Sequence, residues 1–299
     1  MEKLIDIHAD DYAYSINTSK DMLECMEAGN LDSFSVICNT VHFDESMELL
    51  YAKIPTLKFL PYISIHLNLP EGKGVTDLLP ISWAKLFLSS YSFSRNSVKE
   101  KLKKELKWQI DTTQKAIEKC IKIAKDNNIE CHQKGIRLDS HIHTHPIPVV
   151  WQALTEVIEE EKYDIEYIRN PKEPIMPFLK KKELLSTYGI VNMIKNRILM
   201  FYSNKIDRYC DLHKIGKMYM WGLMMSGHMD FDRVKAVYPQ MSKKAQEDKR
   251  KLELLFHPGK ASEDEYSSEM DPNYFRDSNL SENRHIEKNA VMNIKDIIA

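Results

Sequence analysis

The chain is poor in cysteine and has no two cysteines at the Cys-x-x-Cys spacing. Its five cysteines also form an odd set. Both features argue against a disulfide framework and against a thiolate metal site, because each needs cysteines in matched groups. We therefore expect reduced, mostly buried thiols and a cytoplasmic protein. The cysteines are Cys25, Cys38, Cys120, Cys131 and Cys210.

The sequence also lacks a strong charge of either sign and a long hydrophobic run. The net charge of −2 gives no indication of a nucleic-acid surface or of an anionic-membrane partner. The N-terminus enters a candidate strand at once, without a hydrophobic signal segment. The most apolar later stretch, residues 218–229, is too short to span a bilayer. We expect neither nucleic acid nor a membrane among the partners.

There is no linker rich in proline, glycine or serine, no internal repeat and no low-complexity tract. The 299 residues, 43% of them hydrophobic, are enough to bury a substantial core. We therefore predict a single domain over residues 1–299. Two insertions interrupt its regularity: residues 69–96, expected to form a lid or substrate loop, and residues 180–217, expected to form an extra helical excursion.

What the sequence does contain is an alternation of short apolar runs with amphipathic helical patterns. The seven candidate strands are residues 4–8, 33–38, 61–66, 135–139, 165–169, 219–226 and 252–257. The candidate helices are residues 15–28, 45–52, 97–127, 148–161, 180–210 and 231–245. This alternation predicts βα units and a mainly parallel sheet. The expected fold class is α/β, a (β/α) barrel of the TIM-barrel type with about seven parallel strands. A doubly wound open sheet is the alternative.

Ionisable side chains cluster where four of these strands end, in residues 8–11, 64–67, 139–145 and 256–259. Six of the eleven histidines lie in these segments. The carboxyl ends of parallel strands meet at one rim of a barrel, so such side chains would lie close together. The pattern predicts a metal site that supports hydrolysis.

The adjacent carboxylates Asp10 and Asp11 follow the first candidate strand. Successive strand side chains point to opposite faces, so one carboxylate can bind a metal while the other faces the substrate as a base. A turn is the plainer interpretation of an Asp-Asp pair. His66 ends another strand, and a lone histidine there does not decide between a metal ligand and a structural hydrogen-bonding residue.

Three histidines within five residues, His141, His143 and His145, are the most specific signal. They share one face if the strand persists as far as Pro146, which ends regular pairing. Buried histidines each need a polar partner, so three are rarely kept for packing alone. We interpret the cluster as ligands of a metal or substrate, with Asp139 as an acceptor that orients a ligating imidazole. A polar surface loop is the alternative.

Two further candidates end later strands. His257 is followed by a Pro-Gly turn, and general acid catalysis is its favoured role, with turn capping as the alternative. Arg169 could clamp a carboxylate, bind a sugar hydroxyl or simply pair with Glu173 on the surface. The remaining histidines are interpreted as structural: His42, His132, His213, His228 and His285.

Four ordered segments together resemble the YdjC-like family of carbohydrate deacetylases, which includes the chitooligosaccharide deacetylases. They are His-Ala-Asp-Asp-Tyr, Ser-Ile-His-Leu-Asn-Leu, Leu-Asp-Ser-His-Ile-His-Thr-His and Phe-His-Pro-Gly. The resemblance spans nearly residues 3–260 and is weak over residues 180–217 and after residue 261. It departs at His8, where the family usually has Asn, and at Tyr12-Ala13, where it usually has Phe-Gly.

The resemblance implies a barrel-like fold, one divalent metal ion and removal of the N-acetyl group from an acetamido sugar, with release of acetate. It places the metal ligands on Asp11, His66 and His141, the catalytic base on Asp10 and the proton donor on His257. The expected ion is Mg²⁺, with Zn²⁺, Mn²⁺ or Co²⁺ as alternatives. The expected partner is a small, chitooligosaccharide-like saccharide.

Supporting roles in substrate binding or ligand orientation fall on Asp139, His143, His145 and Arg169. A rival enzyme is a metal-dependent phosphoesterase on a similar barrel, which could draw extra ligands from His8, His143 and His145. A rival of another class is a sugar- or metal-binding protein without turnover. The assembly state is left open, with a homodimer among the arrangements considered.

Overall fold

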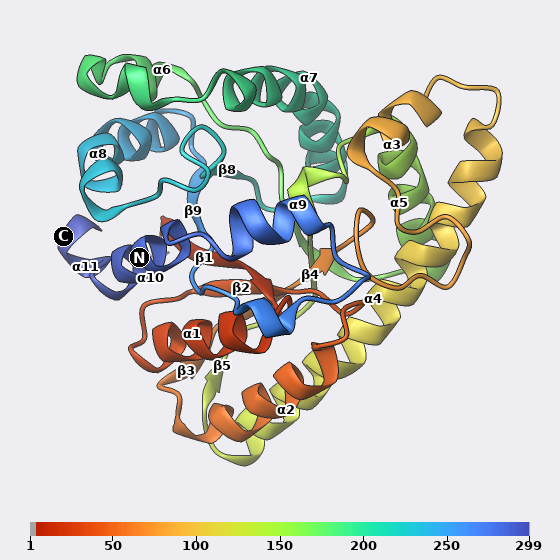
Figure 1. The fold of residues 1–299 in the computed structure, drawn as a ribbon, viewed down its shortest axis with the longest axis horizontal. Coiled ribbons are helices and arrows are strands. Elements are labelled where there is room, and N and C mark those ends of the chain that lie inside the picture. The colour runs from red at the N-terminus through yellow and green to blue at the C-terminus, as the bar shows by residue number, and fades with distance from the viewer. Residues whose placement is uncertain (1–3, 299) are drawn as a thin grey trace.

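The computed structural model describes residues 4–298, in which a curled, seven-stranded parallel sheet forms a half-barrel surrounded by helices (Figure 1). The strand order is β7-β6-β4-β2-β1-β9-β8, and each neighbouring pair is parallel. The predicted α/β class with about seven parallel strands is confirmed. The strands are β1 (Ile5–Tyr12), β2 (Ser33–Val36), β4 (Tyr62–Leu67), β6 (Ile136–Ser140), β7 (Ile165–Ile168), β8 (Met218–Trp221) and β9 (Lys251–Phe256).

The strand order distinguishes a barrel from a doubly wound sheet. From β1 to β7 each strand pairs with the next strand of this sheet along the chain, and β1 also pairs with β9, the last one. Such an order runs in one direction around a circle, whereas a doubly wound sheet reverses direction at a switch point. The circle is open only between β7 and β8. One backbone bond crosses that gap, from the amide of Met220 to the carbonyl of Lys172 at 3.2 Å.

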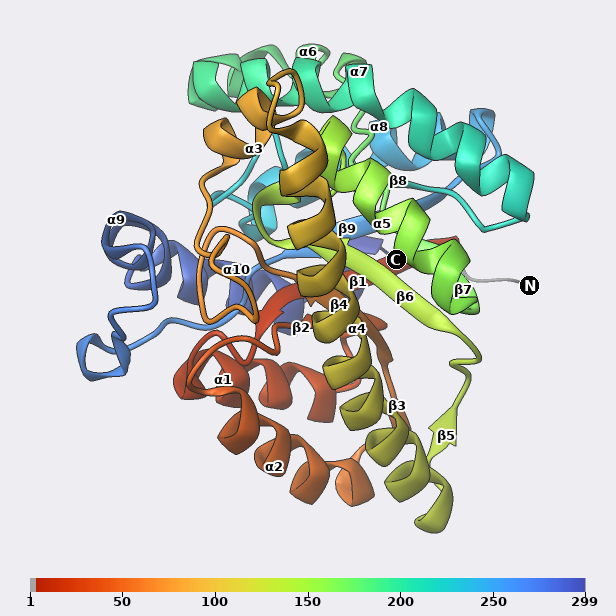
Figure 2. The same cartoon turned by 90° about the vertical axis from the view of Figure 1, so that its right-hand side faces the viewer.

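Helices cover the outer face of the sheet (Figure 2). In α4 the buried positions recur every three or four residues, which is why this long helix lies flat against β4 and α5. The helices are α1 (Ile16–Glu27), α2 (Phe43–Lys53), α3 (Trp83–Ser89), α4 (Arg95–Asp126), α5 (Pro148–Glu161), α6 (Met176–Leu179), α7 (Ile190–His213), α8 (Phe231–Glu247), α9 (Pro272–Tyr274), α10 (Asn283–Met292) and α11 (Lys295–Ile298).

The structure differs from the sequence-based expectation at several elements. The strand expected over residues 219–226 is wrong at its end, because β8 stops at Trp221. A small second sheet pairs β3 (Phe59–Leu60) with β5 (Glu130–Cys131) outside the main one. The expected lid, residues 69–96, contains the helix α3. The expected helix over residues 180–210 is wrong at its start: a 3₁₀ turn occupies Lys182–Thr187, and α7 begins after the extended residues Tyr188 and Gly189. None of the helices within residues 4–298 combines the length and apolar content needed to cross a bilayer.

Glu173 joins the two sides of the open gap. It is fully buried, and its carboxylate accepts the backbone N–H groups of Gly222, Leu223 and Met224 at 2.8, 3.1 and 2.9 Å, just beyond β8. Asn196 of α7 donates to the same carboxylate at 3.3 Å. The loop after β7, the loop after β8 and α7 are therefore tied together at one buried side chain.

Burial raises the pKa of Glu173 to about 7, although the hydrogen bonds that it accepts oppose the shift. The folded chain then holds this proton more tightly than the unfolded chain, so the stability that Glu173 contributes is present below pH ~4.5 and is lost as the pH rises toward 7.

Urea unfolding from pH 4 to 8 should show the wild-type chain losing up to roughly 3 kcal/mol of its free energy of unfolding relative to Glu173→Gln. The exposed Glu183→Gln serves as the control. A difference between wild type and Glu173→Gln that stays constant over this range would contradict the shift.

Candidate metal and catalytic site

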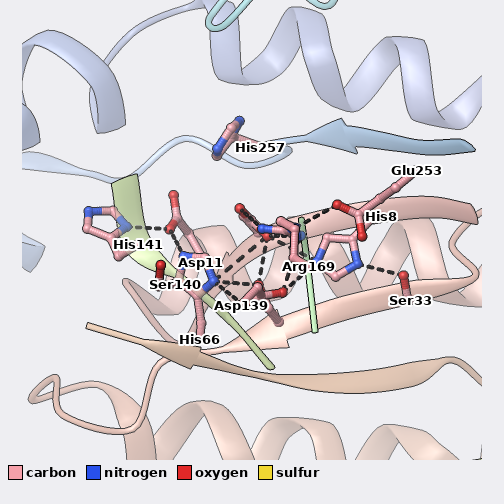
Figure 3. Close-up of polar contacts among 12 residues, drawn as sticks. His8, Asp11, Ser33, His66, Asp139, Ser140, His141, Arg169, Glu253 and His257 are labelled. Carbon is pink, nitrogen blue, oxygen red and sulfur yellow. Dashed lines mark hydrogen bonds and ion pairs between the residues drawn. The ribbon is translucent and has the colours of Figure 1, made fainter. Parts of the chain in front are cut away.

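A cavity of about 530 Å³ opens at the carboxyl ends of the sheet strands. Its wall includes most of the side chains singled out from the sequence, brought together from β1, β4, the turn after β6 and the end of β9 (Figure 3). These residues are Asp10, Asp11, His66, His141, His143 and His257. Arg169, Asp139 and His145 lie beneath them and are fully buried or nearly so.

An irregularity in β1 allows Asp10 and Asp11 to serve different partners. The pairing of β1 with β2 shifts register between Ala9 and Tyr12, and Asp11 has the unusual φ of +72°. Aspartate tolerates this left-handed conformation better than most residues, but it still costs on the order of 1–3 kcal/mol. Asp10 turns toward Arg169, whereas Asp11 turns toward His66 and His141. The pair therefore lies within a strand that ends at Tyr12 and is not a simple turn.

Asp11, His66 and His141 offer ligand atoms that all lie within 4.8 Å of one another. Oδ1 of Asp11 lies 3.0 Å from Nδ1 of His141 and 3.5 Å from Nε2 of His66. All three side chains are almost completely buried. One carboxylate oxygen and two imidazole nitrogens around a common point are a donor set that fits a divalent cation with open positions, as in catalytic zinc sites.

Each of these imidazoles also has a carboxylate at its other nitrogen. Nδ1 of His66 lies 2.6 Å from Oδ1 of Asp139, the contact required by the orienting role predicted for that aspartate. Nε2 of His141 faces Oε1 of Glu71 at 3.5 Å and has no hydrogen-bond partner among the described residues. Such outer carboxylates select the tautomer and hold the ring of a ligating histidine. The nitrogens left for a cation are thus those that face Asp11.

The charges of Asp11, His66 and His141 depend on one another and on the carboxylates around them. Burial lowers the pKa of His66 and His141, but the neighbouring carboxylates outweigh burial and raise these pKa values to about 9 and about 10. Burial opposes ionisation of Asp11 as well, yet His141, His66 and Arg284 hold its pKa well below the usual range. Without a cation, the group therefore consists of a carboxylate between two imidazolium ions at neutral pH.

Arg169 is fully buried and joins three carboxylates. Its Nη1 and Nη2 atoms donate to the two oxygens of Asp10 at 2.8 and 2.9 Å, Nη2 lies 3.2 Å from Asp139, and Nε donates to Glu253 at 2.6 Å. The suggested surface pair with Glu173 is therefore wrong, because Arg169 points into the sheet interior. The carboxylate clamp, another of the predicted possibilities, is the arrangement observed.

A second group, His8, Asp10 and Asp139, also has ligand atoms within 4.8 Å of one another. Here the guanidinium of Arg169 already contacts both carboxylates. Nε2 of His8 lies 3.0 Å from Asp10, and its Nδ1 lies 2.6 Å from Ser33. A positive side chain therefore occupies the position between these carboxylates that a second cation would need.

The three clustered histidines do not share one face, and that expectation is wrong. Strand β6 ends at Ser140, and the backbone then turns through positive φ at Ile142 and His143. As a result His141 faces Asp11, and His143 lines the cavity with its Nδ1 unpartnered among the described residues. His145 folds back to Oγ of Ser140 at 2.5 Å and to the carbonyl of Arg169 at 2.7 Å, so it holds the turn instead of lining the cavity.

His257 reaches the cavity from the end of β9, apart from the Asp11 group (Figure 3). Its backbone N–H donates to Oε2 of Glu287 at 2.6 Å, and its Nδ1 lies 3.6 Å from the same oxygen. The following Pro-Gly turn is tight: Gly259 has φ of +108°, and a Cβ there would lie 2.8 Å from Cα of Thr18. The turn and Glu287 together hold His257 at the rim.

Four partners of the site were missed from the sequence: Glu71, Glu253, Arg284 and Glu287. Glu253 is an inward-facing residue of an otherwise apolar strand, a signal that could have been recognised. Glu71 lies in the predicted lid, and Arg284 and Glu287 lie on a helix beyond the last strand. Nothing local in those segments indicates that they turn toward Asp11, His141 and His257.

The raised pKa values of His66 and His141 predict that cation binding releases protons. A nitrogen must lose its proton to bind a metal, so at pH 7.5 we expect up to two protons released per Zn²⁺ and an apparent affinity that rises as the pH approaches 9 to 10. Isothermal titration in buffers of different ionisation enthalpy measures this number. The exposed His132→Ala should behave like the wild-type chain. Identical binding heats in all buffers would contradict the charge state inferred for the two imidazoles.

Comparison with known proteins agrees with this architecture. The model of the family described as YdjC-like protein matches residues 4–120 and 135–293. A solved structure from Enterococcus faecalis, described as that of a candidate cellobiose-phosphate cleavage protein, is similar with a TM-score of 0.52 at 14% identity. The match covers 100% of this chain and 94% of that one, and it supports the fold alone. A search of curated proteins found no match. The family match confirms the resemblance found in the sequence: the chain belongs to the YdjC-like protein family.

Proposed function

We propose that the protein is a metal-dependent carbohydrate N-deacetylase that removes acetate from an acetamido sugar of the chitooligosaccharide type. The family is one of carbohydrate-processing enzymes. The observation that carries the proposal is the grouping of Asp11, His66 and His141 within 4.8 Å at the wall of a cavity that Asp10 and His257 also line. Cation ligands, a base and an acid around one cavity are the parts that amide hydrolysis needs.

In this proposal Asp11, His66 and His141 hold one divalent ion. Bound there, the ion would polarise the acetyl carbonyl and make a water molecule more acidic. The mixed nitrogen and oxygen donors suit Zn²⁺, and Mg²⁺, Mn²⁺ and Co²⁺ also accept such donors when water completes the shell. The carboxylates Asp139 and Glu71 keep both rings turned toward Asp11.

Asp10 is the proposed proton acceptor. Burial opposes its ionisation, but Arg169, His66 and His8 outweigh burial and hold the pKa of Asp10 well below its usual range. Asp10 is therefore a carboxylate near neutral pH. The bidentate contact with Arg169 also fixes its orientation at the cavity wall, where it can take a proton from the attacking water.

His257 is the proposed proton donor to the departing amine, and His143 is the weaker candidate. Burial and the positive charge of Arg169 hold the pKa of His143 well below its usual range, so it is neutral near pH 7 and carries no proton to give as an imidazolium. His257 has a partly exposed side chain next to Glu287, a carboxylate that can accompany an imidazolium. His143 lines the cavity and is suited to contact the substrate instead.

The cavity fits a sugar substrate in size and lining. Its volume of about 530 Å³ lies within the range of small-molecule sites, roughly 300–1,000 Å³. Trp83 of the predicted lid contributes an aromatic surface to the cavity wall. Asn192 of α7 and Ser226, after β8, contribute polar groups. An aromatic surface beside hydrogen-bonding groups is the combination that binds a pyranose, whose faces are apolar and whose edge is polar.

The rival phosphoesterase has less support. A two-metal clamp needs a second ion about 3.5–4 Å from the first. The group best placed for it, His8, Asp10 and Asp139, already has the guanidinium of Arg169 on its carboxylates. His145, which that alternative would also use, is engaged with Ser140 and the backbone of Arg169. This favours one ion per chain.

The decisive experiment incubates the Zn²⁺- or Mn²⁺-loaded chain with di-N-acetylchitobiose and other acetamido sugars and measures released acetate. We expect release by the loaded chain, no release after chelation, and one bound ion per chain by titration. Asp11→Ala should lose both the ion and the activity, because it removes the central ligand. Saccharide binding without acetate release would instead favour a non-catalytic binding protein, and two bound ions would favour the phosphoesterase.

Asp10→Asn tests the base separately from the cation. The amide keeps the shape of the side chain but cannot accept the proton, so kcat should fall on the order of 10²–10⁴-fold while the affinity for Zn²⁺ stays within a few-fold of the wild-type value. The matched control is Asp277→Asn, which changes another cavity carboxylate that pairs with the exposed Arg276. Full activity of Asp10→Asn would remove Asp10 from the mechanism.

A further inference from the structure

The segment after the last strand closes over the candidate site and contacts it at three points. In Figure 1 α9 crosses in front of the sheet and α10 lies beside β1 and β9. The ring of Tyr274 packs edge-on against His141 at 4.9 Å between centroids. From α10, Arg284 reaches Asp11 and Glu287 reaches His257. The proposed function uses Glu287 beside His257 but assigns no role to Arg284 or Tyr274.

The contact of Arg284 with Asp11 is the most specific of the three. Nη1 and Nη2 of Arg284 both donate to Oδ2 of Asp11 at 3.2 Å. The guanidinium is itself held, because Nε donates to the carbonyl of Ser278 at 3.3 Å and Nη2 to its hydroxyl at 3.2 Å. Arg284 is only 4% exposed, so water competes little for these contacts. The two oxygens of Asp11 thus have separate partners: Oδ2 faces Arg284, and Oδ1 faces the imidazoles.

Because Arg284 already occupies Oδ2, Asp11 is limited in how it can bind a cation. A carboxylate can coordinate through one oxygen or through both, and the second mode needs the lone pairs of both oxygens turned to the ion. Two N–H donors on Oδ2 oppose that mode. Coordination through one oxygen keeps the number of protein ligands low, which suits the four-coordinate preference of Zn²⁺. An added oxygen ligand would instead favour Mn²⁺, which prefers six ligands rich in carboxylate and water.

We propose that Arg284 is a positioning residue that sets ion selectivity: by holding Oδ2, it restricts Asp11 to one-oxygen coordination and favours Zn²⁺ over Mn²⁺. The inference rests on the cation site of the proposed function and not on the reaction. It assigns to α10, on a segment far from Asp11 in the chain, a defined part in the site. Arg284 acts through Asp11 and not through contact with the reacting atoms.

A charge effect must be separated from this geometric effect. Arg284 is positive and lies next to the cation site, so its removal would strengthen the binding of every divalent ion by electrostatics alone. Zn²⁺ and Mn²⁺ carry the same charge, however, and this contribution cancels in the ratio of their dissociation constants. The ratio therefore reports the coordination of Asp11 rather than the local potential.

The experiment titrates the chelator-treated, full-length chain with Zn²⁺ and with Mn²⁺ by calorimetry, and follows Mn²⁺ coordination by electron paramagnetic resonance. In Arg284→Met the preference for Zn²⁺ over Mn²⁺ should fall about tenfold or more, the size of effect that outer partners have on metal sites. Arg284→Lys keeps an N–H donor that can reach Oδ2, and it should retain most of the preference. Arg276→Met, which alters an exposed arginine of the same segment, should leave it unchanged.

The different results separate the two proposals. If Arg284→Met changes the affinities for both ions by the same factor, Arg284 acts only through its charge and the selectivity proposal is overturned. It is overturned as well if Arg276→Met changes the ratio equally, or if Arg284→Lys loses the preference as fully as Arg284→Met. If the ratio changes as expected but no acetamido sugar is hydrolysed, the reaction is wrong and Arg284 keeps its role. If the wild-type chain binds neither ion, both fail. If Arg284→Met does not fold, Arg284→Gln takes its place, because its amide is too short to reach Oδ2. Its preference for Zn²⁺ should then fall in the same way, and an unchanged ratio overturns the proposal.

Discussion

The interior of the half-barrel depends on the charge of Arg169. Asp10, Asp139 and Glu253 are buried carboxylates that would repel one another without a cation, and the guanidinium of Arg169 contacts all three. Buried ion groups of this kind contribute little net stability, but the loss of one partner leaves charges uncompensated at a cost of about 3–5 kcal/mol. The arginine therefore fixes where each carboxylate points: Asp10 to the cavity, and Asp139 to His66.

Strained backbone lies beside these carboxylates, at the place where hydrolysis is proposed. Asp11 and His143 both have positive φ: Asp11 lies where the pairing of β1 with β2 shifts register, and His143 lies just after the end of β6. Such conformations persist when surrounding contacts over-determine them. Asp11 is held by His66, His141 and Arg284, which together leave its carboxylate almost no freedom. A rigid ligand set binds a cation without the entropic cost of ordering flexible side chains.

The sequence carried much of this information. Apolar runs located all seven strands of the main sheet, and the histidines at their ends pointed to one rim because parallel strands place their carboxyl ends together. Local patterns could not show that β6 ends at Ser140 and thereby separates His141 from His143 and His145. Nor could they indicate Glu71 or Arg284, because those partners depend on how an insertion and a distant helix pack. Site residues at the end of a strand could therefore be predicted from the sequence. Site residues that only tertiary packing brings to the cavity could not.

The distance in sequence between Asp11 and Arg284, 273 residues, has a consequence for biosynthesis. A nascent chain exposes Asp11, His66 and His141 to the cell long before the ribosome has made α10. On the selectivity proposal above, the restriction that Arg284 places on Asp11 is added only after α10 has left the ribosome and packed against the sheet. Metal discrimination in this protein would then be a late event of synthesis, and stalled or shortened products would be less discriminating toward metals than the finished molecule.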